Sequence, residues 1–493
     1  MTVSIPEVSG PIPVTENSKP FLQAQRQQVP LDLSSYGYVE EEYFVSGTAN
    51  VYRFDDSYEI EIWHPDVPYT NRILVRRPTD PKNFSGNVVV NFSNQSRGHD
   101  APLMWHSCWE YFLENGDAVV ITTMKPVCVK ALQAFDPDRY APLSWPNPVP
   151  ADETCDPMNP ILPEQSFKDS EDGLAWDIMA QLGALLKSDS AGNPLEYDVE
   201  YVYGTGYSQT GYYSSIFARI FSPLFTLPDG GPVYDGFVAG GCGGIWPINI
   251  SQCDPVIPVD HPLNSGPVHV PVLHEVAQSD LTGPYIEFGG IWGSIRSDSD
   301  DSDDRYRLYP VAGASHRWIQ ALGSESGAEE AAQGGFEMSN IDCVGPNRVS
   351  DFPLHFIHRA MFRNLDRRVR QGTPPPRAER FTLDENREPV LDEHGHAVGG
   401  IRLPCIEVPI AEYHVQSPDI ACLALGYRVP FGTQQLKKMY GNRIRYVSRV
   451  TEVVDELVDE LVGAGFLLEK DGQSIIAEAQ DSPVPAAIGH HHS

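Results

Sequence analysis

The sequence has few basic residues and no long apolar run. Among its 493 residues, 35 are Lys or Arg and 67 are Asp or Glu, which gives a formal net charge of −32 at pH 7. Phosphate backbones and anionic lipids repel such a surface, so we expect neither nucleic acid nor membrane as a partner. A membrane-spanning helix needs about 20 mainly apolar residues, and no segment approaches that length.

Cysteine is also scarce, and its spacing is uninformative. The eight cysteines form no C-x-x-C pair and no zinc-binding spacing. We therefore expect no metal and no other cofactor, and we expect the thiols to be reduced and mostly buried. Pairing of Cys242 with Cys253, which are close in sequence, is the alternative.

Residues 1–21 lack a basic segment followed by an apolar run, which predicts no secretory leader and a cytoplasmic location.

The chain does have enough apolar residues for a large core. Hydrophobic residues make up 41% and charged residues 21% of the sequence. Short apolar runs alternate with segments of helical periodicity, a pattern typical of α/β proteins with a mostly parallel sheet flanked by helices. The predicted strands lie at 87–92, 117–122, 199–203, 234–239, 270–276 and 306–311, and the predicted helices at 104–114, 170–186, 208–221, 352–371 and 450–462.

Changes of pattern along the chain predict three segments. Residues 1–69 alternate polar and apolar positions, which indicates short antiparallel strands packed on the core. Residues 70–371 form the α/β core, with a lid-like insertion rich in Pro, Trp and Asp at 126–165. Residues 372–493 form a C-terminal elaboration of hairpins and helices. The acidic stretch 297–304 has no apolar residue and is expected to be a solvated loop.

The most informative motif is Gly204-Thr205-Gly206-Tyr207-Ser208-Gln209-Thr210-Gly211. A predicted strand runs into a sharp turn with Ser208 at its apex, and a helix follows. Such a turn raises a serine hydroxyl above the sheet and needs small residues beside it. The motif departs from G-x-S-x-G because Thr210 holds the fifth position and the glycine comes one residue later. It predicts that Ser208 is a nucleophile.

Two other interpretations of this motif compete. The first is a glycine-rich turn with an incidental serine. The second is the start of a dinucleotide fingerprint, G-x-G-x-x-G, but its third glycine position holds Gln209. The acidic residue about twenty positions later, Asp229, lies in a Pro/Gly turn rather than at a strand end. Both arguments disfavour a dinucleotide site.

Two further residues follow predicted strands and complete a triad. Asp280 lies just beyond the strand at 270–276, and His316 follows the strand at 306–311. The carboxyl ends of parallel strands meet at one edge of a sheet, so Ser208, Asp280 and His316 are expected at the same edge. In that arrangement His316 takes the proton of Ser208 and Asp280 orients the imidazole. Glu275 is the rival acid, although its position inside the apolar run suggests that it faces away.

The oxyanion donors are predicted by position. One is the backbone N–H of Gln209, the residue after the nucleophile. The other comes from the loop after the first buried strand, where Gln95 is the first choice and Asn94 the alternative.

The motifs resemble those of the α/β-hydrolase-fold superfamily, and in particular a sparsely characterised esterase-like branch. Its members carry G-Y-S-Q-[ST]-G at the nucleophile and V-A-G-A-S-H at the histidine, which here are residues 206–211 and 311–316. The resemblance extends over nearly the whole chain, for example to 135–140, 399–404 and 465–468. Where the branch usually has T-E-T-D before the acid, this chain has A-Q-S-D at 277–280, which keeps the aspartate.

The resemblance implies a serine hydrolase acting on a small-molecule carboxylic ester or lactone through an acyl-enzyme. Tyr140 and Trp145 in the predicted lid would suit an apolar group of that ester, although burial in a core is the commoner use of such side chains. Two alternatives remain open. One is an acyltransferase that passes the same acyl group to an alcohol or amine, and the other is a non-catalytic binding module on the same scaffold.

Overall fold

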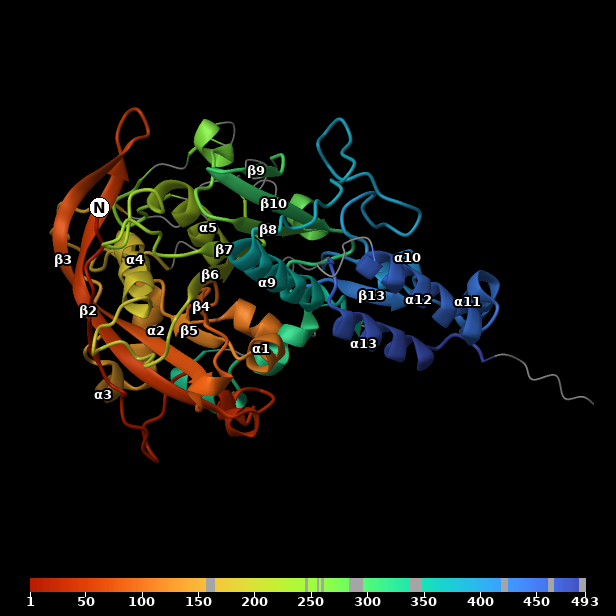
Figure 1. The fold of residues 1–493 in the computed structure, drawn as a ribbon, viewed down its shortest axis with the longest axis horizontal. Coiled ribbons are helices and arrows are strands. Elements are labelled where there is room, and N and C mark those ends of the chain that lie inside the picture. Colours follow the sequence, from red (N-terminus) through yellow and green to blue (C-terminus); the bar gives the residue numbers. More distant parts are fainter. Residues whose placement is uncertain are drawn as a thin grey trace, which may run out of the picture. The chain divides into compact units, whose positions relative to one another are not determined.

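The structure is a computed structural model, and it describes residues 1–156, 165–243, 247–254, 257–258, 261–282, 296–336, 344, 348–417, 424–459 and 465–486. The chain forms two compact units (Figure 1). The first contains Met1–Val272, Phe288–Tyr306 and Ala321–Ser339, and the second contains Leu273–Glu287, Arg307–Gln320 and Asn340–Ser493. The three-segment division at 1–69, 70–371 and 372–493 stays a prediction.

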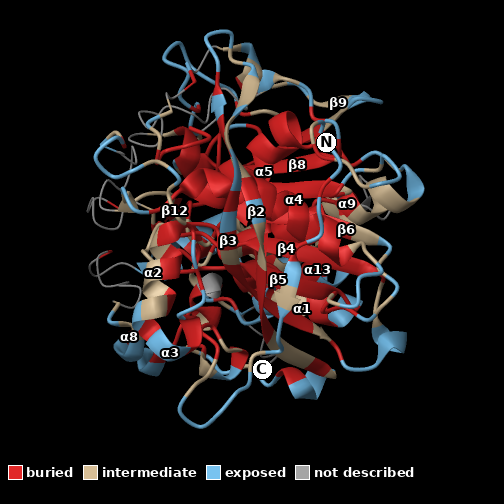
Figure 2. Cartoon of the chain, turned by 90° about the vertical axis from the view of Figure 1, so that its left-hand side faces the viewer, coloured by how far each residue is buried: buried red, intermediate tan, exposed pale blue. Residues whose placement is uncertain are grey.

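The first unit is built on a sheet with a parallel centre. Four strands run in the order β5–β4–β6–β7, and each neighbouring pair is parallel. Every residue of β4, β5 and β7 is buried, as the continuous apolar runs in the sequence require (Figure 2). The predicted α/β fold with a mostly parallel central sheet is confirmed. These strands are β4 (Asn87–Phe92), β5 (Ala118–Thr122), β6 (Tyr201–Tyr207) and β7 (Gly236–Gly240).

An antiparallel ribbon extends this sheet beyond β5. β2 (Tyr38–Phe54) pairs with β3 (Ile60–Pro78), β3 pairs with β5, and the short β1 (Glu7–Ser9) pairs with β2. The antiparallel prediction is confirmed, but the expected short strands are in fact 17 and 19 residues long. A register shift opposite Asn50 leaves Pro65 and Asp66 outside the ladder. The strand therefore continues past a proline that cannot donate a ladder hydrogen bond.

Helices pack on the strands of the first unit. α1 (Leu103–Asn115) contacts β4, β5 and β6, and α5 (Gln209–Ile216) contacts β6 and β7. α4 (Ala175–Leu186) is buried along its whole length and contacts β2. A 3₁₀ turn at Asp172–Leu174 leads into this helix, and the side chain of Glu171 caps the turn by accepting from the N–H of Gly173 at 2.8 Å.

The acidic stretch at 297–304 is more ordered than expected. It forms a hairpin in which β9 (Ser299–Asp301) pairs with the start of β10 (Asp304–Val311). Arg296 makes two hydrogen bonds to Asp304, at 2.5 and 2.8 Å, and lies over the ring of Tyr306. The expectation of an unstructured loop is wrong, because a flanking arginine offsets part of the acidic charge.

The second unit holds most of β8 (Val272–Ala277) and of β10, together with the C-terminal region. The long helix predicted at 352–371 is α9 (Leu354–Gln371), which ends at a left-handed Gly372. In the predicted C-terminal elaboration, isolated antiparallel bridges join Leu383 to Pro389 and Leu391 to Ala397. The remaining elements are α10 (Pro404–Glu407), the small antiparallel sheet β11 (Arg348–Val349), β13 (Tyr427–Pro430) and β12 (Ala411–His414), and the helices α11 (Thr433–Tyr440), α12 (Arg443–Asp459) and α13 (Glu469–Gln480).

Candidate active site

Ser208 lies in a strained turn between β6 and α5. Its backbone has φ 58° and ψ −124°, in the left-handed region that residues with a side chain rarely adopt. The N–H of Ser208 donates to the carbonyl oxygen of Gly240 at 2.9 Å, which ties the turn to the end of β7. Non-glycine residues in such a conformation cost about 1–3 kcal/mol and concentrate at functional sites.

Close backbone packing explains the glycines of this motif. A Cβ at Gly206 would lie 2.2 Å from the carbonyl oxygen of Thr210, and one at Gly211 would lie 2.4 Å from that of Gly240. Thr210 itself stabilises the turn, because its hydroxyl accepts from the N–H of Tyr207 at 3.3 Å and lies 3.2 Å from the Tyr207 carbonyl oxygen. Gly211 therefore allows α5 to approach the end of β7 closely. Thr210, which holds the fifth position of the motif, forms hydrogen bonds within the turn.

Gly204, which had suggested a dinucleotide site, is explained by packing. A Cβ at this position would lie 2.3 Å from the ring of Phe237 on β7 and 3.1 Å from the ring of Phe92 on β4. Both rings are fully buried. The glycine makes room for an aromatic core rather than for a pyrophosphate.

The loop after β4 lies against the serine turn. The side-chain amide of Asn94 donates to the carbonyl oxygen of Tyr207 at 3.0 Å, and the amide of Gln95 donates to the side-chain oxygen of Gln209. The backbone N–H of Asn94 is already used, because it donates to the carbonyl oxygen of Ala101 at 2.8 Å. Of the two candidates for the second oxyanion donor, this geometry favours Gln95.

The second unit brings His316 and Asp280 together. Nδ1 of His316 lies 2.6 Å from Oδ1 of Asp280, and Asp280 is fully buried. The other oxygen of Asp280 accepts from the N–H of Ala277 at 3.0 Å, which fixes the carboxylate at the end of β8. This contact orients the imidazole and favours the tautomer that carries its proton on Nδ1.

A side chain that the sequence did not single out joins the two loops of this pair. Oε1 of Gln278 accepts from the N–H of Gly313 at 2.8 Å and from the N–H of Ala397 at 2.9 Å, and its amide donates to Gly395 at 3.1 Å. Gln278 thus links the acid loop, the histidine loop and a C-terminal hairpin. The only sequence signal is its place two residues before Asp280.

The rival acid, Glu275, is committed elsewhere in the second unit. Its carboxylate is fully buried on β8 and lies 3.6 Å from Nε2 of His358 on α9. Burial lowers the pKa of His358 to about 3, so this histidine is neutral at ordinary pH. The geometry places Asp280, and not Glu275, at His316.

The segment 126–165, predicted as a lid, begins with two helices, α2 (Pro126–Phe135) and α3 (Pro137–Tyr140). At its far end Gln165 donates to the carbonyl oxygen of Ser96 at 3.1 Å, in the loop beside the serine turn. Residues 157–164 lie outside the described residues. Tyr140 and Trp145 are buried in the core of the first unit, so burial is the use that the structure gives them.

A buried ion pair lies next to the Gln95 loop. Lys125 and Asp172 are 2.5 Å apart and line a small cavity together with Gln95 and Ser251. Burial would lower the pKa of Lys125, but the Asp172 carboxylate outweighs it and raises that pKa. Burial, and then the charge of Asp172, raise the pKa of Glu171 to about 8.

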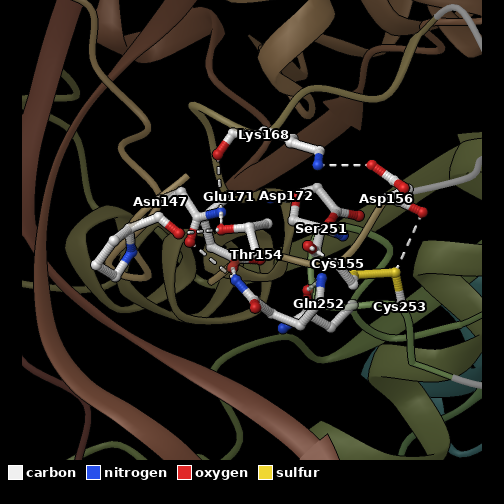
Figure 3. The surroundings of a disulfide bond; sticks show 12 residues. Asn147, Thr154, Cys155, Asp156, Lys168, Glu171, Asp172, Ser251, Gln252 and Cys253 are labelled. Carbon is white, nitrogen blue, oxygen red and sulfur yellow. Dashed lines mark hydrogen bonds and ion pairs between the residues drawn. A yellow bond between two sulfur atoms is a disulfide. The ribbon is translucent and has the colours of Figure 1, made fainter. Parts of the chain in front are cut away.

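A disulfide closes this region (Figure 3). Cys155 is bonded to Cys253, so the expectation of reduced thiols is wrong for this pair. Cys242 is buried and is not the disulfide partner of Cys253. Hydrogen bonds beside the bond join the same two segments, since the amide of Gln252 donates to Asn147 at 2.9 Å. Disulfides persist mainly in oxidising compartments, so this bond weighs against the cytoplasmic location, which stays a prediction.

Two further features are absent from the described parts of the chain. No group of three or more His, Cys, Asp or Glu side chains is arranged to hold a metal ion there. Among the same residues, no helix combines the length and the apolar character that crossing a bilayer demands.

Comparison with known proteins identifies the family. Solved structures with a similar fold include an esterase from Pseudomonas putida ECU1011 (11% identity, 63% of this chain and 84% of that one, TM-score 0.30). Another is an alpha-beta serine hydrolase homologue from Coxiella burnetii (11% identity, 52% and 87%, TM-score 0.25). A third comes from Klebsiella pneumoniae subsp. pneumoniae MGH 78578 and is provisionally classed as a dienelactone hydrolase (12% identity, 59% and 95%, TM-score 0.32). No curated protein matches. The family model described as an alpha/beta hydrolase domain matches residues 8–477, and the chain therefore belongs to that family.

Proposed function

We propose that this chain is a serine hydrolase that cleaves a small-molecule carboxylic ester or lactone through an acyl-enzyme. The observation that carries the proposal is the left-handed backbone of Ser208 at the junction of β6 and α5. A strained turn of this kind presents a nucleophile, and the glycines that permit it have no other evident use than close backbone approach.

The chemistry follows from the residues already described. Oγ of Ser208 attacks the ester carbonyl carbon while Nε2 of His316 takes its proton, and Asp280 stabilises the resulting imidazolium. The N–H groups of Gln209 and Gln95 bind the oxyanion of the tetrahedral intermediate. His316 then gives the proton to the leaving alkoxide, and a water molecule repeats the sequence to release the acid.

Turnover of a panel of p-nitrophenyl esters from acetate to octanoate tests this proposal. We expect Ser208→Ala to lower kcat by about 10⁴-fold or more and to abolish labelling by a fluorophosphonate, with an unchanged circular dichroism spectrum. Ser57→Ala, in the exposed turn between β2 and β3, is the matched control and should retain full activity. Residual activity of Ser208→Ala within tenfold of the parent would exclude Ser208 as the nucleophile.

The same panel addresses the substrate. An apolar acyl group predicts that kcat/KM rises with chain length. Adding a nucleophilic alcohol separates hydrolysis from acyl transfer, because a transferase would form the new ester in preference to the free acid. We expect the free acid as the main product.

A further inference from the structure

A cavity in the second unit contains none of the proposed catalytic residues. It has a volume of about 340 Å³, within the range of small-molecule sites. Its walls come from the start of α9, from α10, β12 and β13, and from the facing sides of α12 and α13. The apolar part of the lining includes Pro353, Phe356, Leu403, Ile410, Val450 and Ile475.

Arg428 and Asp351 form an ion pair in the wall of this cavity. Nη1 of Arg428 lies 3.0 Å from Oδ2 of Asp351, and the hydroxyl of Tyr413 donates to Oδ1 of the same carboxylate at 3.2 Å. The positive charge of Arg428 is therefore offset within the cavity. Burial, and then the charge of Arg359, lower the pKa of His355 to about 3, so this lining residue is neutral.

Glu478 gives the cavity a net negative charge. It lies near the C-terminal end of α13, and within the described residues no cationic side chain forms an ion pair with it. Partial burial, and then the Asp351 carboxylate, raise the pKa of Glu478, as expected for a carboxylate without a cation beside it. The negative end of the α13 dipole acts in the same direction and favours a positive charge at this place.

A buried hydroxyl also faces the cavity without a partner. Ser482 is 5% exposed, and its Oγ has no hydrogen-bond partner within the described residues. Nδ1 of His355, another lining residue, is likewise buried and has no hydrogen-bond partner within the described residues. Buried polar atoms normally have partners, so both atoms are open to a ligand, and both can accept a hydrogen bond.

We propose that this cavity is a second binding site, separate from the hydrolase centre, for a small organic amine. The apolar walls take the hydrocarbon part of the ligand. The ammonium group lies at the end of α13, where Glu478 supplies the opposite charge and Ser482 accepts a hydrogen bond. The aromatic side chain of Tyr446 in the lining adds a surface that attracts cations. A carboxylate ligand is disfavoured, because Arg428 is already paired and Glu478 would repel it.

Calorimetric titration of the full chain with three ligands of similar shape tests this proposal. The ligands are 2-phenylethylamine, 2-phenylethanol and phenylacetate, which are cationic, neutral and anionic at pH 7. We expect the amine to bind at least tenfold more tightly than the alcohol, and phenylacetate to bind most weakly. Ser208→Ala should bind the amine with unchanged affinity, which separates this cavity from the hydrolase centre.

Two variants of α13 locate the site. Glu478→Gln should weaken binding of the amine about three- to tenfold while leaving binding of the alcohol unchanged, because Glu478 is exposed to solvent and its attraction is screened. Glu469→Gln removes the same charge from the exposed first turn of the same helix and should change neither affinity. Equal affinities for the three ligands, stronger binding of the anion, no heat of binding at millimolar amine, or equal effects of the two variants would each overturn the proposal.

Discussion

The serine turn and the acid–histidine pair are built in different ways. Ser208 is held by the backbone, because glycines at 206 and 211 let main-chain atoms approach more closely than any side chain would permit. His316 and Asp280 are held by side chains, through their own hydrogen bond and through the amide bridges of Gln278. Geometry fixed by the backbone fails when an atom is added, whereas geometry fixed by side chains fails when one is removed. The two regions should therefore respond to opposite kinds of substitution.

After the loss of the Ser208 hydroxyl, the largest effect is expected at the acid. Asp280→Asn should lower kcat by about 10³–10⁴-fold, because an amide favours the wrong imidazole tautomer while keeping the shape of the side chain. Glu275→Gln should change kcat by far less, since Glu275 lies near His358. Steady-state kinetics of both variants decide between the two carboxylates, and a reversed outcome would make Glu275 the triad acid.

Adding one carbon should break the serine turn. Gly206→Ala places a Cβ against the backbone of Thr210, so the turn must move, and a shift of about 1 Å can cost roughly 10²-fold in rate. We expect kcat to fall by about 10²–10³-fold. Gly192→Ala is the control, because a Cβ there would meet its nearest neighbour at an ordinary 3.5 Å. An active Gly206→Ala enzyme would show that the backbone tolerates more than we infer.

The two units should also respond oppositely to pH. Burial raises the pKa of Asp177 on α4 to about 6, so its contribution to stability is present at low pH and is lost as pH rises from about 4 through 6. His358 in the second unit has its pKa lowered to about 3, so its contribution is lost as pH falls below about 6.5.

Unfolding by urea at pH 4, 5 and 6 measures both contributions. Relative to the parent, Asp177→Asn should become more stable by about 2–3 kcal/mol from pH 4 to pH 6, and His358→Gln should become less stable by a similar amount. Parallel pH dependence in the two variants would contradict the opposite protonation that we assign to these side chains.

The smallest effect is expected at Gln278. Gln278→Ala should lower kcat about tenfold with little change in KM, because it leaves the N–H groups of Gly313 and Ala397 without their acceptor and loosens the histidine loop. Gln278→Glu keeps the accepting oxygen and should restore part of the activity. If kcat and KM instead changed together, the residue would act on substrate binding rather than on the position of His316.

Much of the fold could be predicted because buried parallel strands leave an unmistakable pattern. The run at 87–92 coincides with β4, and the helix predicted at 352–371 begins and ends within two residues of α9. The length of the β2–β3 ribbon could not be predicted, because prolines in its sequence suggested that the strands end there. In the structure a bulge places Pro65 outside the ladder, so the strand continues. The buried ion pairs of Glu42 on β2 with Arg72 on β3 and with Arg139 on α3 left no signal either, since charged residues in a strand ordinarily indicate a solvent-facing side.

Part of the candidate site could also be predicted from the sequence, and part of it depends on contacts between distant segments. The motif and the chain order predict Ser208, Asp280 and His316 from the sequence alone, because a nucleophile turn needs small residues at fixed positions. The choice between Gln95 and Asn94 depends on the hydrogen bond that the backbone N–H of Asn94 donates to Ala101, because a donor that is already bonded cannot bind an oxyanion. The sequence does not reveal this contact within the loop. The bridging role of Gln278 and the pairing of Cys155 with Cys253 depend on segments distant in sequence, which periodicity does not report.

The Cys155–Cys253 bond also makes a covalent ring of the chain around the nucleophile. The two cysteines are 98 positions apart, and the segment between them contains α4, β6, Ser208, α5 and β7. Closing a loop of this length removes unfolded-state entropy worth roughly 4–5 kcal/mol in the chain-entropy model. A protease cut within the ring would leave both fragments joined, so a nicked molecule would migrate as a single chain until a reductant was added. The segment that carries Ser208 therefore stays covalently closed even when all of its noncovalent contacts are lost.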